Sequence, residues 1–151
     1  MIRLRANRND QRGATLVEFS IAATVFITVI FGTIEFGRAL WTHNALTDAA
    51  RRGARYAVVH SAADSASVKN VVVYGDPAGS AGGKTPILQN LTTDNVQVDY
   101  SGFTLDGGTV QVKITGYQFQ FVVPFVSANI QMPNYSTTLT GESVGLLPPV
   151  L

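Results

Sequence analysis

Residues 13–34 read GATLVEFSIAATVFITVIFGTI, and this stretch decides the fold of the 151-residue chain. No charged residue occurs from Phe19 to Ile34, and Glu18 is the one charged member of the apolar run that opens at Ala14. A helix that covers this run rises about 32 Å, which is enough to cross a hydrocarbon core of about 30 Å. The stretch therefore predicts a transmembrane helix over residues 14–36.

The residues before this run are basic. The first twelve residues contain one acid, Asp10, and four arginines, which are Arg3, Arg5, Arg8 and Arg12. Basic residues beside a span stay on the cytoplasmic side of the membrane. We therefore expect a cytoplasmic leader over residues 1–13 and export of everything after the span.

The composition narrows the class of protein. Charged residues make up 14% of the chain and hydrophobic residues 46%, with a mean hydropathy of +0.18. Average soluble domains carry about 25% charged residues, so this composition favours contact with a membrane or an assembly and excludes global disorder. The chain contains no Cys, which excludes a disulfide, a thiolate nucleophile and a Cys-based metal site.

Three interpretations of the apolar segment compete, and they differ in what they make of Glu18. The first is a cleaved secretory signal, for which Gly37-Arg38-Ala39 supplies small residues at the right spacing but places an Arg between them. The second is a plain membrane anchor, which leaves Glu18 unexplained. A carboxylate inside a membrane helix costs a few kcal/mol and indicates a function by default.

The third interpretation explains the carboxylate. Gly13 lies immediately before the apolar run and Glu18 is the fifth residue after it, which resembles the prepilin signature of the type IV filament superfamily. The resemblance implies that a membrane aspartyl peptidase cuts after Gly13 and leaves Ala14 as the new N-terminus. It also implies that Glu18 is paired in the assembly with the α-amine of a neighbouring subunit, since a carboxylate buried without a cation is strongly unfavourable.

The residues after the span narrow the family. Residues 35–58 read EFGRALWTHNALTDAARRGARYAV. Together with the stretch from Gly13 to Phe19, they resemble the TadE-like minor pseudopilins of the tight adherence (Tad, or Flp) pilus over about residues 12–60. The resemblance implies an inner-membrane subunit that helps to initiate, cap or regulate a pilus used for surface attachment. Its implied partners are other pilins or pseudopilins of the Tad system, the prepilin peptidase and membrane lipid, and whether it enters the filament stays open.

Residues 37–60 are expected to continue the helix beyond the membrane. They contain no Pro and place an apolar set, Leu40, Ala45 or Leu46, Ala49, Gly53 and Ala57, on one face. Glu35 with Arg38, and Asp48 with Arg51 and Arg52, have the spacing of intrahelical ion pairs. Glu35, Arg38 and Trp41 fall where the helix would leave the bilayer, so they are candidates for contact with headgroups or a partner subunit.

Residues 61–151 are expected to form a small exported α+β domain. Val68, Val71 and Val72 permit either a helix or a strand over 68–73, and residues 75–83 form a Gly-rich loop. Alternation predicts a hairpin of 96–100 with 110–114 around a turn at Asp106-Gly107-Gly108, then a bulge at Gly116 before 117–121. Pro124 and Pro133 bound an irregular connection, and a third strand runs from Tyr135 to Val144. The fold class is α+β, a long N-terminal helix packed by an antiparallel sheet of about three strands.

The sequence contains no convincing catalytic or ligand-binding pattern. His43 and His60 lack partner residues at the spacing of a metal site or a triad, so they are expected at the surface or at a helix cap. The acids of the exported part form no paired constellation. We expect no enzyme, no cofactor or metal, no nucleic acid and no small-molecule substrate. The alternative function is a membrane-anchored exported binding module that is not processed as a prepilin.

Overall fold

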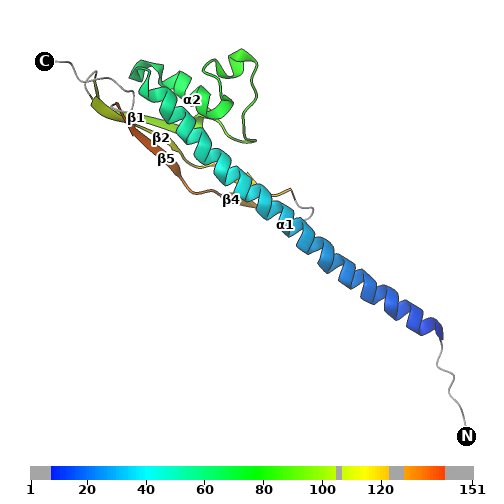
Figure 1. Ribbon diagram of the computed structural model, residues 1–151. Helices are drawn as coiled ribbons and strands as arrows, with labels where there is room; N and C mark the ends of the chain where they lie inside the picture. The colour runs from blue at the N-terminus through cyan, green and yellow to red at the C-terminus, as the bar shows by residue number, and fades with distance from the viewer. Residues whose placement is uncertain (1–7, 105–106, 123–127, 142–151) are drawn as a thin grey trace, which may run out of the picture. The chain divides into compact units, whose positions relative to one another are not determined.

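The computed structural model describes residues 8–104, 107–122 and 128–141, and the chain divides into two units, residues 1–38 and 39–151. The helix α1 (Arg8–Val58) passes from the first unit into the second (Figure 1). It is followed by η1 (Ala62–Asp64), α2 (Ser65–Tyr74), η2 (Gly79–Gly82), η3 (Thr93–Asn95), β1 (Val96–Thr104), β2 (Gly107–Ile114), β3 (Gln118–Gln120), β4 (Asn129–Gln131) and β5 (Tyr135–Thr140). The predicted α+β class is confirmed.

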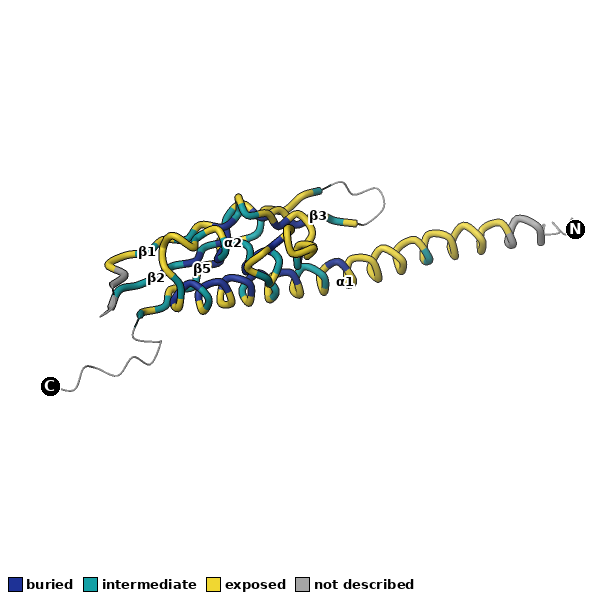
Figure 2. The backbone as a smooth tube through the Cα atoms, turned by 90° about the horizontal axis from the view of Figure 1, so that it is seen from above, coloured by how far each residue is buried: buried dark blue, intermediate teal, exposed yellow. Residues whose placement is uncertain are grey.

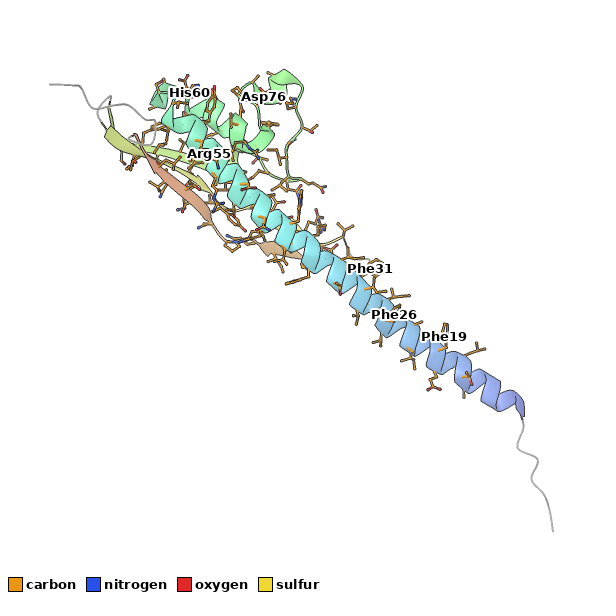
Figure 3. All side chains as sticks on the ribbon, viewed as in Figure 1. Phe19, Phe26, Phe31, Arg55, His60 and Asp76 are labelled. Carbon is orange, nitrogen blue, oxygen red and sulfur yellow. The ribbon has the colours of Figure 1, made fainter. Side chains whose placement is uncertain are left out.

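In the first unit, α1 presents its apolar side chains to the surroundings. The large apolar residues from Leu16 to Phe36 are between 41% and 70% exposed, and Phe19, Phe26 and Phe31 point away from the helix (Figure 3). The helix is long and apolar enough to cross a membrane, and none of its most apolar window is buried in the described structure. α1 begins at Arg8, inside the predicted leader, and residues 1–7 lie outside the described part of the chain.

The second unit contains two antiparallel sheets. The larger has the order β1-β2-β5, with Val96 opposite Ile114 and Ile114 opposite Tyr135 at one end. The smaller pairs β3 with β4, with Phe119 opposite Ile130. The predicted hairpin of β1 with β2 and the predicted three-stranded sheet are therefore confirmed, and the two-stranded sheet is an addition that the sequence did not predict.

One face of α1 closes the core of the second unit. Leu46, Ala49, Gly53 and Ala57 are all buried, as predicted, and Figure 2 shows buried and exposed residues alternating along this part of the helix. The inclusion of Leu40 in this face was wrong, because it is 49% exposed while Thr42 is 3% exposed. An α-helix has about 3.6 residues per turn, so Thr42, four residues before Leu46, lies on nearly the same face as Leu46. Leu40 is six residues before Leu46 and lies about 240° around the helix.

The valine run that permitted a helix or a strand is helical. Val68, Val71, Val72 and Val73 of α2 are buried, and Val72 lies against Gly53 of α1. α2 ends at Tyr74 and is capped by Gly75, whose φ of 72° places it in the left-handed region and whose N–H donates to Val71 O. Gly is favoured at such a helix end because it has no Cβ to clash. The following Gly-rich loop contains the short helix η2.

The expectation of a bulge at Gly116 was wrong. Gly116 has a φ of 69° and separates β2 from β3, which belong to different sheets. Before Gly116 the apolar side chains occupy even-numbered positions, and after it they occupy odd-numbered positions. The strand breaks at this change, so that Val112 and Ile114 before the break and Tyr117 and Phe119 after it are all buried.

Two other strand expectations need correction or stay open. The connection predicted between Pro124 and Pro133 is not wholly irregular, since it contains β4. The third strand ends at Thr140. Pro124, Asp106 and Val144 lie outside the described residues.

Candidate processing and assembly site

Gly13 lies within α1, at a position where a larger side chain would have space. A Cβ built on Gly13 meets no atom within 4 Å, and both Gly13 and Ala14 are exposed. Helix interiors disfavour Gly by about 1 kcal/mol relative to Ala. No contact of the described residues therefore requires a Gly at position 13, and the same holds for Gly32 and Gly37.

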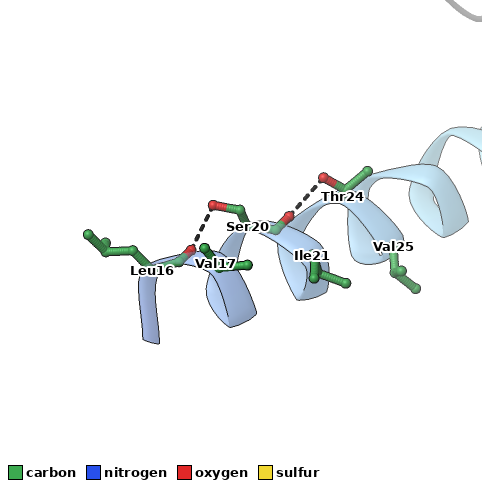
Figure 4. A pocket seen from close by; sticks show the side chains of 6 residues that line it. All are labelled: Leu16, Val17, Ser20, Ile21, Thr24 and Val25. Carbon is green, nitrogen blue, oxygen red and sulfur yellow. Dashed lines mark hydrogen bonds between the residues drawn. The ribbon is translucent and has the colours of Figure 1, made fainter. Parts of the chain in front are cut away.

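Glu18 is an exposed carboxylate on an otherwise apolar part of α1. It lies four residues after Ala14, about one helical turn or 6 Å along the axis. The neighbouring surface is a shallow apolar groove lined by Leu16, Val17, Ser20, Ile21, Thr24 and Val25 (Figure 4). The hydroxyls of this groove are satisfied within the helix, because Ser20 donates to Leu16 O at 2.7 Å and Thr24 donates to Ser20 O at 2.8 Å.

Of the three residues expected near the membrane exit, two pair with each other. Arg38 Nη2 donates to Glu35 Oε2 at 2.8 Å, one turn apart on α1. The Glu35 side chain is 9% exposed and that of Arg38 is 34% exposed. Trp41 is 59% exposed, so its indole is available to surrounding molecules. The predicted pair of Asp48 with Arg51 is long, 4.0 Å between Oδ1 and Nη1, and both side chains are well exposed.

The two histidines lie where the sequence predicted them, His43 at the surface and His60 at a helix cap. His60 stacks on Tyr56 with ring centroids 3.8 Å apart, and its Nδ1 donates to Tyr56 O at 2.8 Å, which caps the end of α1. His43 is exposed, and its Nδ1 lies 2.9 Å from Tyr135 Oη. Burial raises the pKa of Tyr135 above its ordinary value, and Tyr117 adds to this.

The described residues hold no cluster of three or more His, Asp or Glu side chains that could bind a metal ion. Within the described residues, the structure pairs Glu35 with Arg38 and shows no ion pair for Glu18. The sequence reasoning missed the exposed Val122 and Ile130 beside the small sheet. A signal was present, because no Asp, Glu, Lys or Arg occurs from Ile114 to Gly141.

Comparison with known proteins identifies the N-terminal part of the chain. No curated protein matches the sequence, and no solved structure matches it. A family model does match, and it covers Gly13, Glu18, Glu35, Arg38 and Trp41. The family is associated with Tad pilus systems and is not a family of enzymes. Residues 13–55 match the model of the TadE-like proteins, so the resemblance read from the sequence is confirmed and this chain carries a TadE-like segment.

Proposed function

We propose that this chain is a minor pseudopilin of a Tad pilus, which waits in the inner membrane and helps to initiate, cap or regulate the pilus. The observation that carries the proposal is the family match over residues 13–55, which begins at Gly13 and includes Glu18. In this proposal the protein acts in pilus assembly and attachment through protein partners and catalyses no reaction.

The processing step in the proposal is cleavage after Gly13 by a prepilin peptidase. Two features support it: the glycine has no role in the described fold, and the residues around it are exposed. Cleavage removes the basic leader and leaves Ala14 with a free α-amine. This amine is then one turn from Glu18 in the same chain and is the cation offered to a neighbouring subunit.

The assembly step concerns Glu18. In lipid, a carboxylate at this depth is disfavoured by a few kcal/mol. Among packed helices it is tolerated only beside a cation. The exposed position of Glu18 on α1 leaves it accessible to such a cation from another subunit. Pairing with the neighbour's Ala14 amine therefore favours the assembled state over the isolated helix in the membrane.

The membrane placement in the proposal has the N-terminus in the cytoplasm and residues 39–151 in the periplasm. The Glu35–Arg38 pair lies at the end of the apolar segment with its charges matched at 2.8 Å. Trp41 follows one turn later and is exposed. Trp is enriched at the boundary between membrane and water, so we assign Trp41 to the periplasmic headgroup region.

The intact mass of the protein recovered from its native host tests the processing step. The proposal expects loss of residues 1–13, with Ala14 at the N-terminus. Gly13→Ala is expected to abolish this cleavage, and Gly37→Ala is the matched control, because a Cβ at Gly37 also meets nothing within 4 Å. Recovery of the complete wild-type chain, or normal cleavage of the Gly13→Ala protein, would instead support a membrane-anchored binding module that is not a prepilin.

A further inference from the structure

The exposed apolar side chains of the second unit are unevenly distributed. Among its described residues, the large apolar side chains classed as exposed are Leu40, Trp41, Val59, Val122 and Ile130. Leu40 and Trp41 lie near the start of the unit, on α1. Val59 follows the end of α1 at Val58. The positions of Val122 and Ile130 depend on where the β3–β4 hairpin lies along the unit.

Two contacts fix the direction of the large sheet along α1. Tyr135, the first residue of β5, lies 2.9 Å from His43 near the start of the unit. Tyr100 of β1 donates to Ala57 O, 3.5 Å away, near the end of α1. The sheet end that contains Ile114 and Tyr135 is therefore the end near His43.

The β3–β4 hairpin continues beyond this end. β2 stops at Ile114 and β5 starts at Tyr135, and the chain between them forms β3 and β4. Met132 N–H donates to Tyr117 O at 2.9 Å, which holds the base of the hairpin together. Figure 2 shows β3 beyond the labelled strands β1, β2 and β5. Val122, 70% exposed, and Ile130, 51% exposed, thus lie at the same end of the unit as Leu40 and Trp41, and opposite to Val59.

The hairpin is also free of charge. The whole stretch between Lys113 and Glu142 contains no Asp, Glu, Lys or Arg. Charged residues of the unit lie outside the hairpin, for example Arg55 on α1, Asp99 on β1 and Asp94 just before β1. A water-facing hairpin gains solubility from charges, so an uncharged hairpin with exposed Val and Ile is typical of a surface that is covered in the working protein.

We propose that Leu40, Trp41, Val122 and Ile130, together called the apolar end, lie in the headgroup region of the bilayer that α1 crosses. The inference rests on the membrane placement in the proposed function and adds the β3–β4 hairpin as a second membrane contact. The proposed function assigns Trp41 to the headgroup region, and Val122 and Ile130 lie at the same end of the second unit as Trp41, so the hairpin is expected at the same membrane surface. Apolar side chains inserted about 5–10 Å at the headgroup boundary are favoured there, and an aromatic belt of Trp is typical.

The absence of Cys from the chain allows a direct test with single cysteines in the full-length protein. Ile130→Cys carries a polarity-sensitive fluorophore, and Val59→Cys is the matched control, an apolar side chain 60% exposed at the opposite end. Phe26→Cys reports on the span itself. Each labelled protein is reconstituted in vesicles of phosphatidylethanolamine and phosphatidylglycerol, with and without lipids that bear a nitroxide quencher, placed at a shallow acyl position for positions 130 and 59 and at a deep acyl position for position 26.

The proposal expects the nitroxide lipids to quench most of the emission from position 130 and almost none from position 59. Quenching at position 26 with none at position 130 would overturn the inference and leave the membrane placement intact. No quenching at position 26 would overturn the membrane placement, and the inference with it. Protection of position 130 from aqueous iodide that grows with protein density, without quenching by lipid, would assign the apolar end to a neighbouring subunit and refute the lipid contact.

Discussion

Gly53 is a residue at which α1 closely approaches α2 and β2. A Cβ placed there would overlap Val72 Cγ2 of α2 and would meet Val112 Cγ1 of β2 at 3.3 Å. Val72 is fully buried and its branched side chain has one preferred rotamer in a helix. The missing side chain of Gly53 is therefore a condition for packing α2 and β2 against the same turn of α1.

We predict that Gly53→Ala destabilises the exported domain even though Ala is the better helix former. The gain in helix propensity is about 1 kcal/mol, and overpacking of a rigid core typically costs about 1–3 kcal/mol, so the expected net loss is up to about 2 kcal/mol. Thermal unfolding of the full chain in detergent measures it. In a double-mutant cycle with Val72→Ala, the effect of Gly53→Ala should be much smaller, and strict additivity would contradict the steric explanation.

We predict that Glu18→Ala leaves the protein in the membrane and abolishes its part in assembly. Removal of the carboxylate makes the helix more favourable in lipid by a few kcal/mol, so insertion is unharmed. The neighbour's α-amine would remain buried without its partner, at a cost of about 3–5 kcal/mol. Pilus number and membrane-fraction protein are compared with Thr24→Ala, whose hydroxyl only donates to Ser20 O. Normal piliation of the Glu18→Ala strain would favour the plain anchor.

At the scale of elements, the break between β2 and β3 depends on one backbone conformation. Gly116 has a φ of 69°, and a Cβ there meets only Asn95 Nδ2, at 3.8 Å. Space is therefore available, and the restriction is conformational. The left-handed region costs a residue with a Cβ about 1–2 kcal/mol, and Asn tolerates it better than other residues.

We predict that Gly116→Val destabilises the domain by at least about 1–2 kcal/mol and that Gly116→Asn costs clearly less. The expected order of melting temperatures is Gly, then Asn, then Val. Equal losses in the two variants would show that crowding, and not the positive φ, requires the glycine. The β3–β4 hairpin is the element that should respond first, because Gly116 connects it to β2.

The sequence predicted the elements in which local pattern and tertiary packing agree. Alternation predicted the pairing of β1 with β2 because each strand has one apolar face, and the Pro-free run after Ile34 predicted the continuation of α1. It failed at Leu40, because an apolar residue was assumed to face inward, whereas the buried residue on that turn is Thr42. It left α2 undecided because Val suits both periods. It missed β4, whose three residues are all exposed and show no alternation.

The candidate site was predictable in part: the spacing of its residues could be read from the sequence, but their burial could not. The distance from Gly13 to Glu18 and the basic leader are properties of the sequence, and the family match includes Gly13 and Glu18. The burial of Glu35 is not a property of the sequence, because spacing predicts its pairing with Arg38 but not the loss of solvent around it. The apolar end joins segments that are distant in the chain, and only the fold brings Trp41 and Ile130 to one end of the unit.

At the scale of the whole molecule, two tyrosines packed at the core set a limit on alkaline stability. Burial raises the pKa of Tyr100 and Tyr135 above the ordinary 10.0, and the charge of Asp64 adds to the effect at Tyr100. The unfolded chain therefore loses these protons at a lower pH than the folded chain does. The stabilisation is fully present below pH 10 and is lost as the pH rises through the folded-state pKa values.

We predict that the free energy of unfolding of the domain falls as the pH rises above 10, the ordinary tyrosine pKa. Tyr135→Phe is expected to lower stability at neutral pH, because the contact with His43 Nδ1 is lost, and to make the alkaline decline shallower. Denaturant unfolding of the full chain in detergent at several pH values measures both effects. A decline of unchanged steepness in the variant would exclude Tyr135 as a contributor.

The hydroxyl bonds within α1 have a mechanical consequence. Ser20, Thr24, Thr28 and Thr33 each donate to the carbonyl oxygen four residues earlier, at 2.7 to 2.9 Å. The hydroxyls of these four side chains are therefore not free to donate a hydrogen bond to an adjacent helix. An adjacent helix can slide or turn against this surface without breaking such a bond. In the proposed assembly, the pairing of Glu18 with a neighbour's α-amine is then the contact that sets the stagger between adjacent helices.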